Sequence, residues 1–160
     1  MKKVEKDYEE LLKLFNKNKV KYCIVGAFAL AFHAIPRYTK DMDIFIEASE
    51  KNAKGILKAL NEFGFGVLNL SMSDFSAKGR TIQLGYEPVR IDILTLIDGC
   101  TFEDVWKNKK NGRYGKEKIF FIGLDDMIKN KKASKRKQDK ADLEILSAVK
   151  KLTKIRRRLQ

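Results

Sequence analysis

The spacing of apolar residues along the chain predicts a protein that contains both helices and strands. Residues 2–18 carry apolar side chains three or four positions apart, which is typical of an amphipathic helix. The same period predicts further helices at 27–35, 50–63, 101–106, from 124 onward, and at 138–157. In the last of these, five apolar side chains are expected to face inward, namely Leu143, Leu146, Val149, Leu152 and Ile155.

Short runs rich in β-branched and aromatic residues predict the strands, at 20–25, 41–47, 67–70, 80–85, 89–96 and 117–122. The runs 80–85 and 89–96 are separated by Tyr86-Glu87-Pro88, so we expect them to pair as a hairpin. Asn111-Gly112 is a typical turn sequence. Helices and strands therefore alternate along most of the chain.

The length and composition of the chain fit a packed domain. Its 160 residues, 44% of them hydrophobic, predict a single domain over 1–160, with a basic helical part at 124–160 packed on it. We expect neither a secretory signal nor a membrane span, because no apolar run approaches the roughly 18 residues that a span needs. The expected location is therefore the cytoplasm, with no membrane partner.

The positive charge of the chain is concentrated near its C-terminal end. The net charge is +13, and residues 129–160 hold 13 Lys or Arg against 3 Asp or Glu. Such a segment suggests a polyanionic partner such as nucleic acid or nucleotide phosphates, although a solvated helix face would look the same. Cys23 and Cys100 have neither the spacing of a zinc site nor that of a disulfide framework. His33 lies in an apolar helical run, so we expect a structural histidine whose ring is hydrogen-bonded within the fold.

Three aspartates stand out against the strand pattern. Asp41 and Asp43 are two residues apart at the start of a strand and would therefore share one face. Like charges at this distance repel, so a cation between them is a natural partner. Asp92 lies in the middle of another β-branched strand, where it also needs a partner. A shared hard cation, Mg²⁺ or Mn²⁺, would serve all three, whereas Arg90 or Lys40 could instead pair with Asp92.

Gly26 stands where the strand 20–25 meets the helix that begins at Ala27. Glycine lets a ligand approach the backbone there, and the free N–H groups at a helix N-terminus attract an anion. Carboxylates, a divalent metal and a phosphate cradle together indicate phosphoryl or nucleotidyl transfer. Asp92 could also take the proton from an acceptor hydroxyl.

The order of these residues resembles the nucleotidyltransferase superfamily with the polymerase-beta-like fold. The resemblance rests on three motifs, Ile24-Val25-Gly26-Ala27, Arg37-Tyr38-Thr39-Lys40-Asp41-Met42-Asp43 and Arg90-Ile91-Asp92-Ile93-Leu94. Within the superfamily, the chain is most similar to small prokaryotic nucleotidyltransferases related to abortive-infection toxins. A later pattern, Lys131 with Arg136 and then Asp139 and Asp142, also resembles that group. The resemblance implies an α/β (α+β) fold with a mixed, mostly antiparallel sheet of about five to six strands, flanked by helices and followed by basic C-terminal helices.

The resemblance also implies roles for individual residues. Asp41, Asp43 and Asp92 would be the catalytic, metal-binding carboxylates. Nucleotide phosphates would be bound by Gly26, Ala27, Arg37, Thr39, Lys131 and Arg136, with Asp139 and Asp142 orienting the last two. Because Ala27 has no hydroxyl, its contact with phosphate would come from the backbone N–H.

The expected function is transfer of a nucleoside monophosphate from an NTP to a hydroxyl on RNA, protein or a small molecule, with an antitoxin as a further candidate partner. Two alternatives stay open at this point. One is a non-catalytic nucleic-acid-binding module that keeps the fold. The other is an interaction protein whose carboxylates simply pair with lysines.

Overall fold

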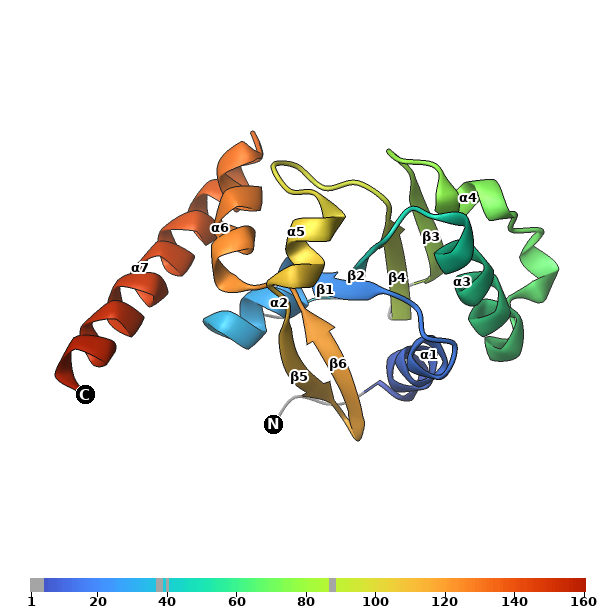
Figure 1. Ribbon diagram of the computed structural model, residues 1–160, viewed down its shortest axis with the longest axis horizontal. Helices are drawn as coiled ribbons and strands as arrows, with labels where there is room; N and C mark the ends of the chain where they lie inside the picture. Colours follow the sequence, from blue (N-terminus) through green and yellow to red (C-terminus); the bar gives the residue numbers. More distant parts are fainter. Residues whose placement is uncertain (1–4, 37–38, 40, 87–88) are drawn as a thin grey trace.

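The computed structural model describes residues 5–36, 39, 41–86 and 89–160. Within them the chain forms one six-stranded sheet with helices packed around it (Figure 1). The helices are α1 (Lys6–Lys17), α2 (Gly26–His33), α3 (Glu50–Phe63), α4 (Met72–Ser76), α5 (Phe102–Lys107), α6 (Leu124–Ala133) and α7 (Lys137–Leu159), with a 3₁₀ turn η1 at Gly66–Leu68. None of the helices described is both long and apolar enough to cross a bilayer.

The sheet combines antiparallel and parallel pairings. Its strands are β1 (Tyr22–Val25), β2 (Asp41–Ile46), β3 (Thr81–Tyr86), β4 (Val89–Leu94), β5 (Lys110–Tyr114) and β6 (Glu117–Phe121), in the spatial order β3-β4-β2-β1-β6-β5. Three pairs are antiparallel, β1–β2, β3–β4 and β5–β6, whereas β1–β6 and β2–β4 are parallel. The expected mixed, mostly antiparallel sheet and the hairpin at 80–96 are both confirmed.

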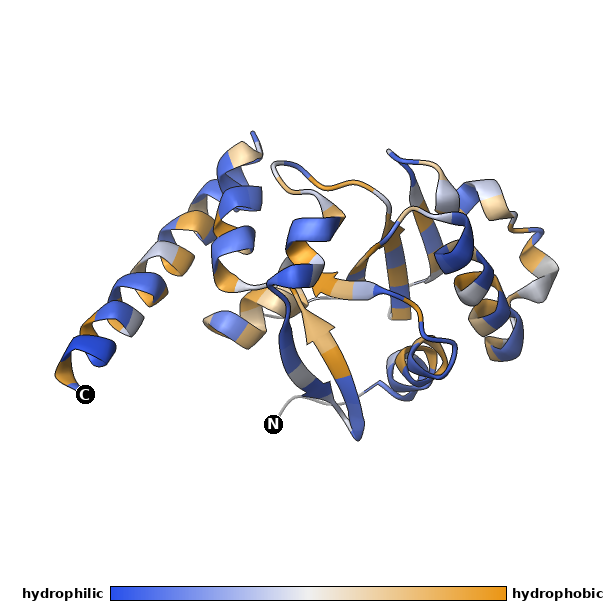
Figure 2. Ribbon diagram, viewed as in Figure 1, coloured by the Kyte–Doolittle hydropathy of each residue, from blue (hydrophilic) through white to orange (hydrophobic). Residues whose placement is uncertain are grey.

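The core lies around the central strands. All four residues of β1 are buried, which fits a strand covered on both faces. Figure 2 shows apolar residues along the strands and on the inward sides of α1 and α3, with polar residues outside. Helix α3 has the predicted bounds because its ends are well capped. The Ser49 hydroxyl accepts from the Asn52 N–H, and Gly64 ends the helix at φ 110°.

Two local predictions are wrong. Residues 67–70 do not form a strand, because the chain turns through η1 and then through Asn69 in the left-handed region at φ 52°. Asn111-Gly112 does not form a turn, because both residues lie inside β5 and pair with β6. The turn between these strands lies instead at Gly115, which has φ 59°. A side chain at position 112 would collide with the ring of Phe121, so packing explains this glycine.

The apolar face of the last helix, α7, is only partly buried. Leu146 is fully buried and Leu143 packs against the core, as expected. Leu152 and Ile155 are 57% and 51% exposed, so the prediction that they face inward is wrong. The C-terminal half of α7 extends past the sheet (Figure 1), and these two side chains stay largely exposed there.

Candidate active site

Strands β2 and β4 bring the predicted carboxylates together. The two strands run parallel, with Asp43 opposite Asp92 and Asp41 opposite Arg90. Alternate residues of a strand share a face, so three carboxylates and one guanidinium lie on the same face of the sheet. The parallel register between β2 and β4 is therefore what places residues from distant parts of the sequence side by side.

Arg90 forms an ion pair with Asp92 through two hydrogen bonds. Its Nε donates to Oδ1 at 3.2 Å and its Nη2 donates to Oδ2 at 3.1 Å. The same Nε lies 3.9 Å from Oδ1 of Asp41. One of the two partners considered for Asp92 from the sequence is therefore found beside it, and the other, Lys40, lies outside the described residues. A planar guanidinium suits this two-point contact with a carboxylate.

Asp43 and Asp41 are less well satisfied than Asp92. Burial, followed by the charges of Asp92 and Asp41, raises the pKa of Asp43 to about 6, although Lys131 and Arg90 act in the opposite direction. The buried Oδ1 of Asp41 accepts no hydrogen bond from the described residues, and the Arg90 Nε nearest to it is 3.9 Å away. Buried anionic oxygens without donors are costly, which makes this pair suitable for a cation.

The fit of a metal ion follows from these contacts. In the part of the chain that the structure describes, no group of three or more His, Cys, Asp or Glu side chains is arranged to bind one metal ion. Both oxygens of Asp92 are engaged by Arg90, so Asp41 and Asp43 are the carboxylates left for a cation. Carboxylate oxygens are the donors that Mg²⁺ and Mn²⁺ prefer, so this pair fits the chemistry of either ion.

Gly26 packs directly against Asp43. It has φ 67°, and a Cβ built on it would clash with Oδ2 of Asp43 and lie 3.2 Å from its Cβ. Helix α2 begins at this residue, and its N-cap residue Val25 makes no side-chain hydrogen bond to the helix. The N-terminal N–H groups of α2 therefore start next to the carboxylates without a side-chain cap. This is the arrangement expected of a phosphate cradle at Gly26 and Ala27.

Thr39 supports the start of β2. Its hydroxyl donates to the carbonyl oxygen of Asp41 at 3.0 Å and accepts from the Asp41 N–H at 3.3 Å. In this arrangement the side chain of Thr39 fixes the backbone that carries Asp41. Arg37, the other residue implied for this stretch, lies outside the described residues.

Lys131 is a buried lysine on α6. Its ammonium lies 2.8 Å from Oδ1 of Asp139 and 3.2 Å from Oδ2 of Asp142, both on α7. Its charge acts on Asp43, as the pKa of that residue shows. Arg136 differs, because its side chain is 78% exposed and its Nε lies 3.9 Å from Asp139. The two aspartates thus hold Lys131 firmly, whereas Arg136 lies at the surface.

Sequence reasoning treated Arg90 only as an alternative partner for Asp92 and missed the role of Ser134. The Ser134 hydroxyl donates to Oδ2 of Asp139, which completes the support of Lys131. Arg90 and Asp92 are two positions apart on one predicted strand, and this spacing already indicated that their side chains could pair. His33 behaves as predicted, because its Nε2 lies 2.6 Å from the carbonyl oxygen of Ile122.

Comparisons with known proteins find one family match and several similar solved structures. Residues 4–159 match the family described as "Nucleotidyl transferase of unknown function (DUF2204)". A search of curated protein sequences gives no match. Among solved structures, the lincomycin-bound lincosamide antibiotic adenylyltransferase LnuA is similar, with a TM-score of 0.52 and 16% identity over 91% of this chain and 97% of that one. TM1012 of Thermotoga maritima, assigned as a nucleotidyltransferase, has a TM-score of 0.48 and 19% identity over 98% and 95% of the two chains.

Proposed function

The chain belongs to this nucleotidyl transferase family, and from that premise we propose that it moves a nucleoside monophosphate from an NTP to a hydroxyl acceptor with the help of Mg²⁺ or Mn²⁺. The observation that carries the proposal is the position of Asp41 and Asp43. Asp43 lies against the start of α2, which has no side-chain cap. Asp41 stands two residues away on β2, and its buried Oδ1 accepts no hydrogen bond from the described residues. A site for a cation therefore adjoins a site for phosphate.

Each residue has a distinct part in this proposal. Asp41 and Asp43 would hold the metal ion, which supplies charge neutralisation for the triphosphate when bound. The backbone N–H groups at the start of α2, at Gly26 and Ala27, would receive the phosphates. Lys131 adds positive charge beside Asp43, where negative charge accumulates. Arg37, Thr39 and Arg136 remain proposed nucleotide-binding residues on the basis of the resemblance, and Thr39 also positions Asp41.

The transfer itself exchanges one phosphorus–oxygen bond for another. The acceptor oxygen bonds to the α-phosphorus, the bond from that phosphorus to the bridging oxygen breaks, and pyrophosphate leaves. The hydroxyl proton passes to a base, for which we propose Asp92, which could alternatively serve as a third metal ligand. Arg90 holds both oxygens of Asp92 through its two hydrogen bonds and so fixes the orientation of that carboxylate.

The proposed acceptor carries a hydroxyl and belongs to RNA, to a protein or to a small molecule, and an antitoxin is a further proposed partner. We also propose that 1–160 act as one domain. Helices α6 and α7 form the basic part at 124–160, and Lys131 on α6 joins them through its ion pairs to α7. This part and the carboxylate strands would then form a single site.

Calorimetry with Mg²⁺ and each NTP tests the proposal. The parent protein is expected to bind one or more Mg–NTP complexes, and Asp41→Ala and Asp43→Ala are expected to lose that binding. Asp98→Ala removes an exposed carboxylate and is the matched control. Equal binding by the parent and both site variants would contradict the proposal. Tighter nucleic-acid binding by those variants, without Mg–NTP binding by the parent, would favour a non-catalytic module.

Labelled NTPs incubated with the parent protein, Mg²⁺ and a cell extract would identify the acceptor. Incorporation of label into a macromolecule or a small molecule, lost in Asp43→Ala, is the expected result. The kind of molecule that takes up the label then distinguishes the proposed acceptors.

A further inference from the structure

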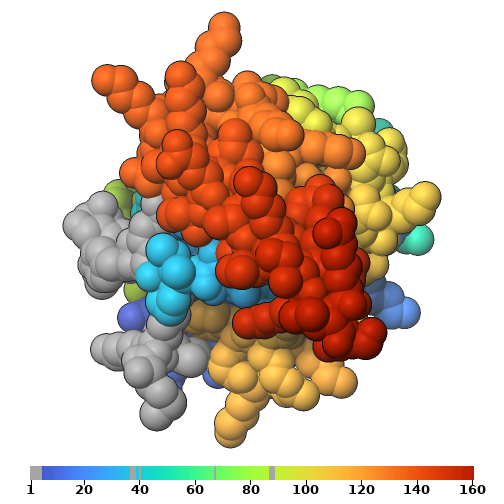
Figure 3. Space-filling model, turned by 90° about the vertical axis from the view of Figure 1, so that its left-hand side faces the viewer, coloured from blue at the N-terminus to red at the C-terminus, as the bar shows by residue number. Residues whose placement is uncertain are grey.

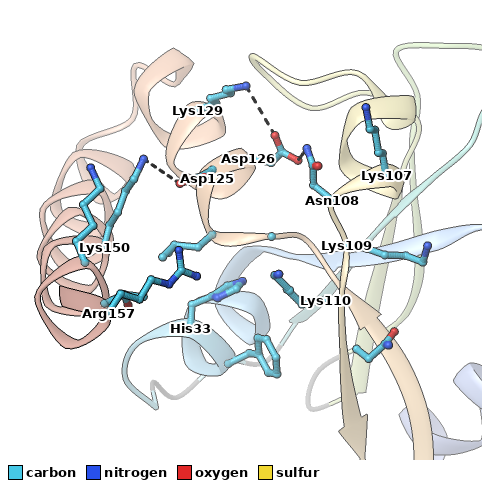
Figure 4. Close-up of a pocket in the computed structure, with 16 residues that line it drawn as sticks. His33, Lys107, Asn108, Lys109, Lys110, Asp125, Asp126, Lys129, Lys150 and Arg157 are labelled. Atoms are coloured by element: carbon cyan, nitrogen blue, oxygen red, sulfur yellow. Dashed lines mark hydrogen bonds and ion pairs between the residues drawn. The ribbon is translucent and has the colours of Figure 1, made fainter. Parts of the chain in front are cut away.

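A basic cavity lies at the opposite end of α2 from the carboxylates. It is a cavity of about 970 Å³ between α2, the α5–β5 connection, α6 and α7 (Figure 4). Seven of its 16 lining residues are Lys or Arg, and two are Asp. Figure 4 shows Lys150 and Arg157 on the α7 side and Lys107 on the α5 side, with His33 and Lys110 between them.

Most of the positive charge in this cavity is not neutralised. Asp125 pairs with Lys150 at 2.9 Å. Asp126 lies 4.0 Å from Lys129 and accepts a hydrogen bond from Asn108. The ammonium of Lys109 lies over the ring of Trp106, 3.9 Å from its centre.

Four cationic residues of the lining form no salt bridge among the described residues, namely Lys107, Lys110, Lys154 and Arg157. Charge of one sign in a hollow concentrates the electrostatic field there. The cavity is therefore suited to a ligand that carries several negative charges.

The cavity also offers an aromatic surface. Phe32 lines it and is 43% exposed, although one face of its ring stacks on Phe121 with the ring centres 4.2 Å apart. Pockets for small neutral ligands are lined mainly by apolar side chains, which is not the case here. Cations that track phosphates, together with an aromatic ring on which a base can stack, are the features of single-strand nucleic-acid binding.

Two helices connect the cavity with the carboxylates. Helix α2 begins at Gly26 against Asp43 and ends at His33 in the cavity wall, which is about 10 Å at the rise of an α-helix. Helix α6 begins with Leu124 at the cavity and carries Lys131, whose charge acts on Asp43. A strand bound in the cavity could therefore bring its end to the carboxylates within a few nucleotides.

We propose that this cavity binds the sugar–phosphate backbone of a single-stranded nucleic acid, whose terminal hydroxyl is the acceptor. The inference rests on the proposed nucleotidyl transfer and names the class of its acceptor. Figure 3 shows α7 extending along the same face beside α2, and its last turns add Arg156 and Arg158, both exposed. The basic surface thus continues from the cavity along α7, as a chain of phosphates requires.

Fluorescence polarisation with a labelled 12-nucleotide single strand, as RNA and as DNA of one sequence, tests this proposal over a series of salt concentrations. The main variant is the triple change Lys110→Gln, Lys154→Gln and Arg157→Gln. We expect its affinity to fall at least tenfold at low salt. The slope of log affinity against log salt should become shallower by about 2, because three phosphate contacts are lost at about 0.7 each.

A matched control removes the same charge from the far side of the molecule. The exposed residues Lys51, Lys54 and Lys58 lie on α3, and their combined change to Gln should leave affinity within about twofold and the slope unchanged. Phe32→Leu keeps an apolar side chain but removes the ring. It should weaken binding about fivefold or more without changing the slope, because a stacking contact carries no charge.

Three outcomes would overturn the proposal. One is that the cavity triple variant binds like the α3 triple variant. Another is that Phe32→Leu has no effect while poly-glutamate displaces the strand as well as unlabelled RNA does, which would indicate charge recognition alone. The third is that the parent binds neither RNA nor DNA. Binding of either RNA or DNA supports the proposal, and the nucleic acid that binds more tightly is then the expected acceptor.

Calorimetry of the cavity triple variant with Mg–NTP separates this inference from the proposed function. These three residues lie outside the carboxylate site, so Mg–NTP binding should match that of the parent. If the parent itself fails to bind Mg–NTP, the proposed function fails whatever the polarisation result. If Mg–NTP binds normally and the single strand binds without need of the cavity, only the acceptor inference fails.

Discussion

Arg90 holds both carboxylate oxygens of Asp92, with Nε–Oδ1 and Nη2–Oδ2 distances of 3.2 and 3.1 Å. The two residues stand two positions apart on β4, on the face that also carries Asp41 and Asp43 through the β2–β4 pairing. The site therefore contains its own counter-charge. An incoming metal ion meets a guanidinium that already neutralises part of the carboxylate cluster.

Replacement of this guanidinium should make the fold depend on divalent metal. In Arg90→Gln, three carboxylates remain without their nearest positive charge, so the melting temperature without metal should fall. Added Mg²⁺ should restore it, and the metal-induced rise should exceed that of the parent, because Asp92 is then free to join the ligands. Thermal unfolding with and without Mg²⁺ measures both effects. Arg80→Gln, which removes an exposed partner of Asp74, should show no such metal dependence.

Neutralisation of Asp43 should stabilise the fold while it removes metal binding. The raised pKa of about 6 means that ionisation of Asp43 at pH 7 opposes folding, by at most about 3 kcal/mol for a shift of this size. The free energy of unfolding of the metal-free parent should therefore rise as the pH falls from 7 toward 5 and Asp43 takes up a proton. Asp43→Asn should be about 1–2 kcal/mol more stable than the parent at pH 7 and lack this rise.

Urea unfolding of the metal-free protein at pH 5 and pH 7 tests the Asp43 prediction. Asp98→Asn neutralises an exposed carboxylate and should change stability by less than about 0.5 kcal/mol. A less stable Asp43→Asn variant at pH 7 would show that Asp43 is better satisfied than its surroundings indicate.

A methyl group at position 26 should damage both the fold and the phosphate cradle. Gly26 has φ 67°, and its new Cβ would clash with the carboxylate of Asp43. Gly64→Ala is a matched control, since that residue also has a positive φ, 110°, but nothing lies within 4 Å of its Cβ position. The control should lose about 1 kcal/mol and Gly26→Ala about 2–3 kcal/mol in chemical denaturation. Only Gly26→Ala should also weaken Mg–NTP binding, and equal losses in the two variants would contradict the close packing.

The shared face of the two carboxylates on β2 could be predicted because it depends on local rules. The alternation of Asp41 and Asp43 places both on one face of any strand. Asp92 is unusual inside a β-branched run, which indicated a partner before any register was known. The hairpin of β3 and β4 followed in the same way from two alternating runs around a turn. Each of these inferences needs only a few consecutive residues.

The features that were missed depend on contacts between distant segments. The contact of Arg90 with both Asp92 and Asp41 requires the parallel register of β2 and β4, which no local pattern specifies. The basic cavity forms only when α7 packs beside α2, and its residues are separated by more than 100 positions in the chain. The turn predicted at Asn111-Gly112 failed for the same reason, because packing against Phe121 explains that glycine.

The buried ion pairs of Lys131 should give the fold a distinct sensitivity to acid. Burial alone would raise the pKa of Asp139, but the Lys131 ammonium and the Ser134 hydroxyl outweigh it and hold that pKa below its usual value. A carboxylate of this kind stabilises the fold above its unfolded pKa of about 3.9 and ceases to do so as the pH falls through its native pKa. The parent should therefore lose stability below about pH 4.

Asp139→Asn should remove the part of this acid sensitivity that belongs to Asp139, since no ionisation remains at that position. At pH 7 the variant should be about 2 kcal/mol less stable than the parent, because Lys131 keeps only Asp142 as its charged partner. Asp125→Asn breaks an exposed pair with Lys150 and should cost less than about 1 kcal/mol. Unfolding free energies of the three proteins between pH 2 and pH 7 measure the difference. An acid profile of Asp139→Asn that parallels the parent's would show that Asp142 alone holds Lys131.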